Sequence, residues 1–123
     1  MAKNTSPTLV RLNQLLLQTL FRAGHLFTAQ DISIYHHLPR LLQQQGFQQI
    51  QTCTQLIDYR AGTDEGQLFI EDMQLTYKAI LPFMRRWIRV PDDYDAIYQQ
   101  ALVEMRQPDF AATWEMVTTW GYR

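Results

Sequence analysis

The sequence predicts an α+β domain with four helices and one antiparallel pair of strands. Leucines recur at helical spacing near the start of the chain, and the apolar period changes from about 3.6 to two after Gly46. A second alternating segment closes the chain, after two further helical patterns. Two strands separated by two helices can pair antiparallel, so we expect both alternating segments to form one sheet.

The chain has 123 residues, which is enough for one domain with its own core, spanning residues 1–123. Its net charge of −1 gives no long-range attraction to nucleic acid or to an anionic membrane. The single cysteine, Cys53, excludes an intrachain disulfide and a cysteine-based zinc site. We interpret Cys53 as a small apolar strand residue and expect a cytoplasmic protein.

The first apolar run is amphipathic and does not span a membrane, because Arg11, Asn13, Gln14 and Gln18 interrupt it. We expect residues 1–5 to form a loose tail. Ser6 is a good N-cap residue, Pro7 suits the first helical position, and Gly24 ends the pattern. The predicted apolar stripe of this first helix comprises Leu9, Leu12, Leu16, Leu20 and Ala23.

A second helix and a strand follow, with Ser33 as a possible cap. Because Pro39 would remove a helical hydrogen bond, we expect the regular helix to start near His36 or His37. Gly46 can supply the left-handed cap, and a strand covers about Gln48–Asp58. This strand carries apolar residues on both faces, so we expect it to be covered on both sides.

The second half of the chain predicts two helices and the closing strand. Thr63 or Asp64 caps the third helix, and Pro82 should kink it or end its first part. Pro91 or Asp92 begins the fourth helix, and Pro108 ends it. The predicted stripes are Phe69, Ile70, Met73, Tyr77, Ile80, Leu81 and Met84, and then Tyr94, Ile97, Tyr98, Ala101, Leu102 and Met105.

The closing strand starts near Phe110 and places Trp114, Met116, Thr118 and Trp120 on one face. An aromatic stripe on a strand usually belongs to a core, and we expect the same here.

The stretches LPRLLQQQGFQQI (residues 38–50) and IDYRAGT (residues 57–63) resemble the late part of class I S-adenosylmethionine-dependent methyltransferases. In that family a helix leads into the sixth strand of a Rossmann-like sheet. SPTLVRLNQLLLQTLFRAG looks like the helix after the fifth strand, and WEMVTTWGYR looks like the last strand. The resemblance implies the second half of the methyltransferase fold, without the cofactor-binding half.

The resemblance does not extend to a cofactor site. Such a site needs a glycine-rich turn after the first strand, and no two of the five glycines form a G-x-G turn after a strand. No residue can therefore be assigned to S-adenosylmethionine, which the isolated chain is not expected to bind. By region alone, the resemblance implies six substrate-pocket candidates: Tyr35, His36, His37, Asp58, Arg60 and Tyr77.

Other sequence patterns suggest no catalytic or metal site. Adjacent His36 and His37 do not converge on a helix, and no third ligand stands at metal spacing. Arg85 to Arg89 (RRWIR) mixes basic and aromatic residues as single-strand binders do, but it reads better as a solvated helix end. No nucleophile lies in a motif with a histidine, so no catalytic residue is assigned.

Two hypotheses follow. The chain completes a methyltransferase active site with another chain, or it is a non-catalytic interaction or dimerisation module. In both, Trp114–Trp120 would be a strand with one unpaired edge, and an open apolar edge recruits another strand. We expect a homodimer through this edge, with a heteromeric protein partner as the next possibility.

Overall fold

The computed structural model describes residues 3–26 and 34–123, and it confirms the α+β class with an antiparallel sheet. These residues form five helices, where the sequence predicted four, because the expected third helix is divided before Pro82. The elements in chain order are β1 (Lys3–Asn4), α1 (Pro7–Arg22), α2 (Ile34–Gln44), β2 (Gln48–Arg60), α3 (Asp64–Ala79), α4 (Leu81–Trp87), α5 (Tyr94–Met105) and β3 (Ala111–Tyr122).

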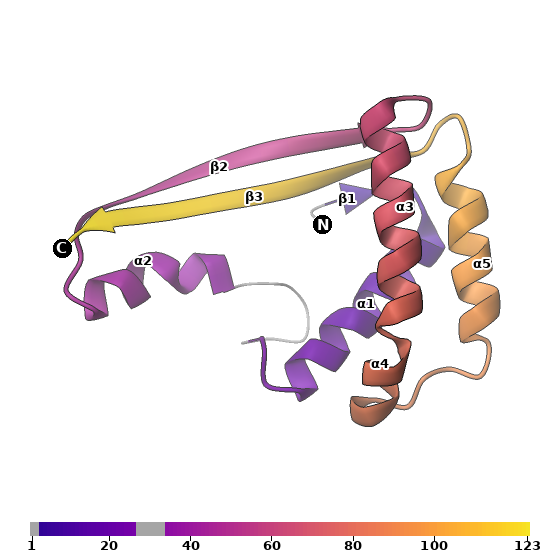
Figure 1. Ribbon diagram of the computed structural model, residues 1–123, viewed down its shortest axis with the longest axis horizontal. Helices are drawn as coiled ribbons and strands as arrows, with labels where there is room; N and C mark the ends of the chain where they lie inside the picture. The colour runs from indigo at the N-terminus through magenta and orange to yellow at the C-terminus, as the bar shows by residue number, and fades with distance from the viewer. Residues whose placement is uncertain (1–2, 27–33) are drawn as a thin grey trace.

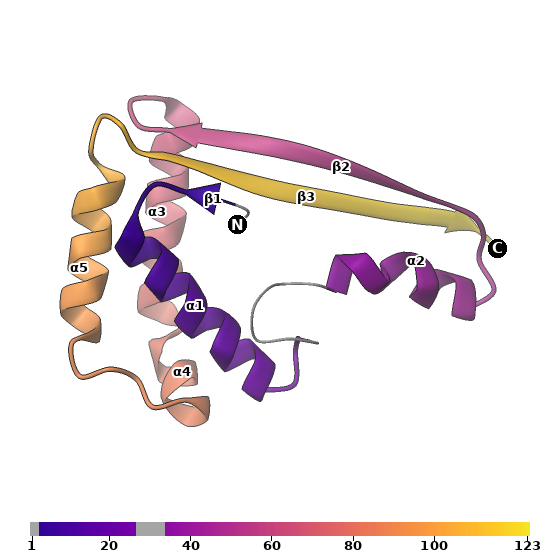
Figure 2. The ribbon, with the colours of Figure 1, turned by 180° about the vertical axis from the view of Figure 1, so that it is seen from behind.

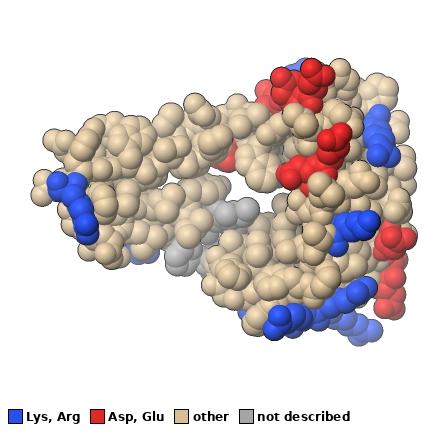
Figure 3. Space-filling model, in the orientation of Figure 1, with Lys and Arg blue, Asp and Glu red and all other residues tan. Residues whose placement is uncertain are grey.

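The molecule consists of a helical body and a long arm. Helices α1, α3, α4 and α5 form the body, and the β2/β3 ribbon extends away from it (Figure 1). Helix α2 lies beside the far half of the ribbon, and the view from behind shows the same arrangement (Figure 2). On the face drawn in Figure 3, the arm is mostly uncharged, with a basic patch at its tip.

The ribbon is built by one antiparallel ladder between the two predicted strands. Its register runs from Arg60 opposite Ala111 to Gln51 opposite Trp120, which confirms the expected pairing. On the other side of β3, the two residues of β1 pair with Thr113 and Ala112. Residues 3–5 are therefore not the loose tail that the sequence suggested, because backbone hydrogen bonds hold them to β3.

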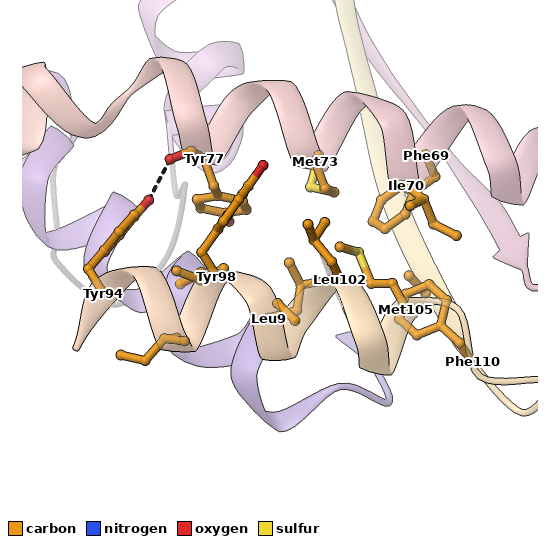
Figure 4. Close-up of a cluster of buried hydrophobic side chains, with 14 of the residues drawn as sticks. Leu9, Phe69, Ile70, Met73, Tyr77, Tyr94, Tyr98, Leu102, Met105 and Phe110 are labelled. Atoms are coloured by element: carbon orange, nitrogen blue, oxygen red, sulfur yellow. Dashed lines mark hydrogen bonds between the residues drawn. The ribbon is translucent and has the colours of Figure 1, made fainter.

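The hydrophobic core lies between α3 and α5, with α1 packed behind them (Figure 4). All six residues of the predicted α5 stripe are buried, as are Phe69, Ile70, Met73 and Tyr77 of α3. Figure 4 shows the labelled side chains of α3 and α5 pointing from the two helices toward one another. The ribbon joins this core only at its base, where Tyr59 stacks on Phe69 with ring centroids 4.8 Å apart.

The start of α1 is tied to α5 by a partly buried polar network. Ser6 caps the helix as predicted, because its hydroxyl accepts a hydrogen bond from the Leu9 N–H at 3.0 Å. The same hydroxyl donates to the Glu104 carboxylate at 2.9 Å. The Thr8 hydroxyl and N–H donate to this carboxylate at 2.6 and 3.2 Å. A negative charge at a helix N-terminus also opposes the positive end of the helix dipole.

Helix α2 differs from the prediction. It is already helical at Ile34, and Pro39 lies inside it, whereas we expected the helix to start near His36. Pro39 is the sixth of the eleven residues of α2, so it removes one hydrogen bond in the middle of the helix. The contacts that the apolar face of α2 makes with the ribbon outweigh this cost. The predicted Ser33 cap lies outside the described residues.

The β2–α3 connection depends on the hydroxyl of Thr63 and on the absence of a side chain at Gly66. Thr63 caps α3, since its hydroxyl accepts a hydrogen bond from the Gly66 N–H at 3.0 Å. A Cβ atom at Gly66 would lie 1.9 Å from the Arg60 carbonyl oxygen, so only glycine fits there.

The fourth predicted helix, α5, begins at Tyr94, two residues later than Asp92, because Asp93 takes the N-cap position.

We expect the Leu12→Ala variant to lose about 2–5 kcal/mol of unfolding free energy, because Leu12 is only 1% exposed and its removal leaves a cavity. Chemical denaturation monitored by tryptophan fluorescence measures this loss. Val10→Ala on the same helix is the control, since Val10 is 39% exposed and should change stability by less than about 0.5 kcal/mol. Equal losses in the two variants would contradict the described packing of α1.

We further expect acid to weaken the contact between α1 and α5. Burial favours the neutral form of Glu104, but the hydrogen bonds from Thr8 and Ser6 outweigh it and lower the pKa of the carboxyl. A lowered pKa contributes stability above the ordinary glutamate value, and this contribution is lost as the pH falls through the folded-state pKa. Glu104→Gln should therefore remove part of the stability change between about pH 5 and 3. Identical pH profiles for the variant and the wild type would refute this role.

Candidate functional site

The far half of the ribbon has two distinct faces. Residues that are paired across the ladder share a face. One face, which we call the open face, carries Met116, Thr118, Trp120 and Tyr122 of β3 with Gln51, Cys53 and Gln55 of β2. The other, which we call the α2 face, carries Glu115, Val117 and Thr119 of β3 with Thr52, Thr54 and Leu56 of β2.

The α2 face is covered unevenly. Glu115, Val117 and Thr119 are half-buried, whereas the β2 residues opposite them are exposed, including Leu56 at 67%. Helix α2 contacts both strands, but along this stretch of the face it covers the residues of β3 and leaves Thr52, Thr54 and Leu56 of β2 exposed. Figures 1 and 2 agree, since α2 lies on the β3 side of the ribbon in both views.

The open face contradicts the prediction of a core stripe. Met116, Trp120 and Tyr122 are 45%, 39% and 59% exposed, and Cys53 is exposed as well. The expectation that both faces of β2 would be covered is also wrong, because the far half of β2 is exposed on both. Alternation identified the strand correctly, but burial depends on a covering layer that the described residues do not supply. Of the predicted stripe on β3, only Trp114, at the base, packs against the core.

The outer edge of β3 is paired only at its start. The Thr5 N–H donates to the Ala111 carbonyl at 3.0 Å, and the Ala111 N–H donates to the Thr5 hydroxyl at 3.1 Å. Because backbone groups alternate between the two sides of a strand, Glu115, Val117, Thr119 and Gly121 turn theirs to this same edge. No other strand of residues 3–26 and 34–123 pairs there. We call this the free edge.

A bulge shapes the tip of the arm. The register shifts between Gln48 and Gln51, and Gln49 has a φ of 52°, which is uncommon for a residue other than glycine. A Cβ atom at Gly121 would lie 3.1 Å from the Gln48 carbonyl oxygen, so a larger residue there would press on the bulge. The guanidinium of Arg123 lies 5.6 Å from the centre of the Phe47 ring, which places a cation at the tip.

The six substrate-pocket candidates lie in three separate places. Tyr35, His36 and His37 are on α2 beside the arm, where the rings of Tyr35 and His36 are 4.4 Å apart. Asp58 and Arg60 are at the base of β2, and the Asp58 carboxylate accepts a hydrogen bond from the Thr113 hydroxyl at 3.0 Å. Tyr77 is buried in α3. The structure does not bring the six together.

A cleft of about 700 Å³ lies between α3, α4 and α5. Tyr77, Tyr94 and Tyr98 line it together with charged residues, among them Lys78, Arg85, Asp92 and Asp95. The sequence patterns did not indicate this cleft, because its tyrosines also fit the predicted core stripes.

The tyrosines of the cleft serve the packing of the helices. The Tyr94 hydroxyl donates to the Tyr77 carbonyl at 2.6 Å, and the Tyr98 hydroxyl donates to the Gln74 carbonyl at 2.9 Å. Burial raises the pKa of Tyr94 to about 12 and the pKa of Tyr77 still further, with a neighbouring tyrosine adding to each shift. These hydroxyls stay protonated at neutral pH and are not suited to act as bases.

The described residues contain no cluster of His, Cys, Asp or Glu that could hold a metal ion. In the same part of the chain, none of the helices is long and apolar enough to cross a membrane. The basic segment Arg85–Arg89 ends α4, with Arg85 and Arg86 exposed and Ile88 buried, as a solvated helix end would be.

Comparison with known protein families, with curated proteins and with solved structures found no match to this chain.

Proposed function

We propose that this chain is the substrate-pocket half of a class I S-adenosylmethionine-dependent methyltransferase, and that a second chain completes its sheet. The free edge of β3, with α2 placed over the same strand, is the observation that carries the proposal. The segments at residues 38–50 and 57–63 that resemble the family form α2, the start and end of β2, and the turn into α3.

The position of α2 favours the edge of β3 over the equally open edge of β2. A helix centred on the ribbon would cover both strands, but α2 covers β3 and leaves Thr54 and Leu56 exposed. A strand added beside β3 would thus lie next to an existing helical layer. In α/β enzymes, helices cover the faces of the sheet. A strand added beside β3 would bring this sheet closer to that architecture.

The residues of this chain do not fit an S-adenosylmethionine site. Gly24, Gly46 and Gly62 have positive φ values at turns after helices or strands, and Gly66 accommodates the Arg60 carbonyl oxygen. None of these positions forms a backbone cradle for a ligand. We therefore assign the cofactor to the second chain, and we assign no catalytic step to residues of this one.

The second candidate function is a non-catalytic interaction module. The separation of the six pocket candidates favours it, because Tyr77 is buried in α3 whereas three other candidates lie on α2. The two candidates differ in the partner that they require. A methyltransferase half needs a partner that carries a glycine-rich cofactor site, whereas an interaction module does not.

We expect the purified chain alone not to bind S-adenosylmethionine. Isothermal titration calorimetry with the cofactor at millimolar concentration should give only heats of dilution. Micromolar binding would contradict the assignment of the cofactor to another chain.

The proposal is tested by affinity purification of the chain from its native lysate, with identification of the captured protein by mass spectrometry. We expect a protein with a glycine-rich turn after its first strand, and we expect the complex, but not this chain alone, to bind radiolabelled S-adenosylmethionine. A stable complex that does not bind the cofactor would refute the methyltransferase proposal in favour of the interaction module.

A matched pair of proline variants locates the contact. Thr119 and Thr52 face each other across the ladder, with their hydroxyl oxygens 3.2 Å apart. Thr119→Pro removes an N–H from the free edge of β3, whereas Thr52→Pro removes one from the outer edge of β2. We expect Thr119→Pro to lose the partner and Thr52→Pro to keep it. The reverse result would move the contact to β2.

A further inference from the structure

The open face of the arm and one side of α3 form the two walls of a corner. Tyr59 and Trp114 lie on the open face at the base of the ribbon, and Tyr59 stacks on Phe69 of α3. A shallow pocket of about 320 Å³ lies where the walls meet, lined by Tyr59, Glu65, Leu68, Phe69, Asp72 and Trp114. The corner is therefore continuous with the exposed side chains of the arm.

The wall formed by α3 is apolar with an acidic border. Residues 65, 68, 72 and 75 are spaced by three or four and thus share one side of the helix. Leu68 and Leu75 are 65% and 67% exposed, and Glu65 and Asp72 lie beside them. We call these four residues the α3 stripe. Exposed leucines at helical spacing are typical of a helix face that packs against another surface.

We propose that two copies of this chain interlock, with their open faces packed against each other and the tip of each arm in the corner of the other copy. The open face carries no charged side chain from residue 51 to 55 or from 116 to 122, because Glu115 lies on the α2 face. Packing two such faces therefore removes no charge from water. The apolar side chains Met116 and Trp120 would be buried in both copies.

The charges at the two ends of the contact are complementary. The tip of the arm carries Arg123, and the corner that would receive it carries Glu65 and Asp72. Figure 3 shows the basic patch at the tip and acidic side chains near the junction of the ribbon with the body. A two-fold axis makes both contacts twice, which is the usual symmetry of a self-complementary surface.

The size of the surfaces explains why both contacts are needed. The open face from residue 114 to 122 is roughly 26 Å long and roughly 10 Å wide, from the rise and spacing of strands. That is about 260 Å² per copy, whereas a stable interface buries about 800 Å² per partner. The α3 stripe, on a helix about 24 Å long, is the second surface that an arm of this length can reach.

This dimer does not rest on the proposed methyltransferase function. It uses the open face and leaves the free edge of β3 available to a strand of another chain. Helix α2 lies on the opposite face, so it would form the outer layer of the dimer and would not separate the two ribbons.

The test is sedimentation velocity of the full chain over a concentration series from about 1 to 500 μM, a range that spans weak to moderate association. We expect a mass twice the 14.6 kDa of one chain at the upper end. The Met116→Lys variant should be a monomer at concentrations at which the wild-type chain is a dimer. Leu56→Lys is the matched control, since Leu56 is an exposed apolar residue on the other face of the ribbon and should leave the dimer intact.

A second pair of variants tests the corner. Leu75→Lys on the α3 stripe should weaken the dimer at least tenfold, whereas Val103→Lys, at a 51% exposed position on α5, should not change it. All four substituted positions are exposed, so we expect each variant to fold. Circular dichroism checks that it does.

The thiol of Cys53 distinguishes this dimer from one formed through strand edges. Cys53 lies on the open face opposite Thr118 and is exposed in one chain. We expect its reaction with a thiol reagent to slow as the concentration rises, and to stay fast in Met116→Lys. A monomer at all concentrations would overturn the proposal. So would a dimer that keeps a reactive Cys53 and is unaffected by Met116→Lys, because that result would place the contact at the free edge.

Discussion

The β2/β3 ladder is the interaction on which the rest of the structure depends, because among the described residues it joins the arm to the helical body. A two-stranded ribbon is marginally stable in water by itself. Here the ladder is held at its base, where Tyr59 and Trp114 meet the core, and at its far half, where α2 lies against β3. Between these two supports, the open face and the two outer edges of the ribbon carry apolar or backbone groups that the described residues do not cover.

The helical elements could be predicted because their signals are local. Ser6, Thr63 and the α5 stripe are read directly from spacing and capping chemistry, and the structure places all of them as expected. Pro39 misled the prediction, since propensity argues against a proline inside a helix but the apolar face of α2 decides its extent. The pairing of β1 with β3 has no local signal either, because two residues are too few to show a period.

The candidate site was harder to predict for a physical reason. Alternation shows which side chains share a face, but it does not show whether another layer covers that face. Trp114 and Trp120 have the same residue type and the same orientation on β3, yet Trp114 packs against the core and Trp120 is exposed. The difference is their distance from the helical body. The sequence predicted an outer edge of β3 with no partner in the chain, whereas residues 3–5 pair with the start of that edge. It also missed the open face.

The free edge and the open face of the arm would bind different kinds of partner. The free edge offers N–H and C=O groups, which only another strand satisfies in regular order. The open face offers Met116 and Trp120, which any complementary apolar surface can cover. Because α2 lies over the β3 side of one face and leaves the other bare, a strand at the edge and a surface on the open face would not compete for the same atoms. The arm can therefore serve self-association and strand addition at the same time, and variants that affect only one of the two contacts can separate them.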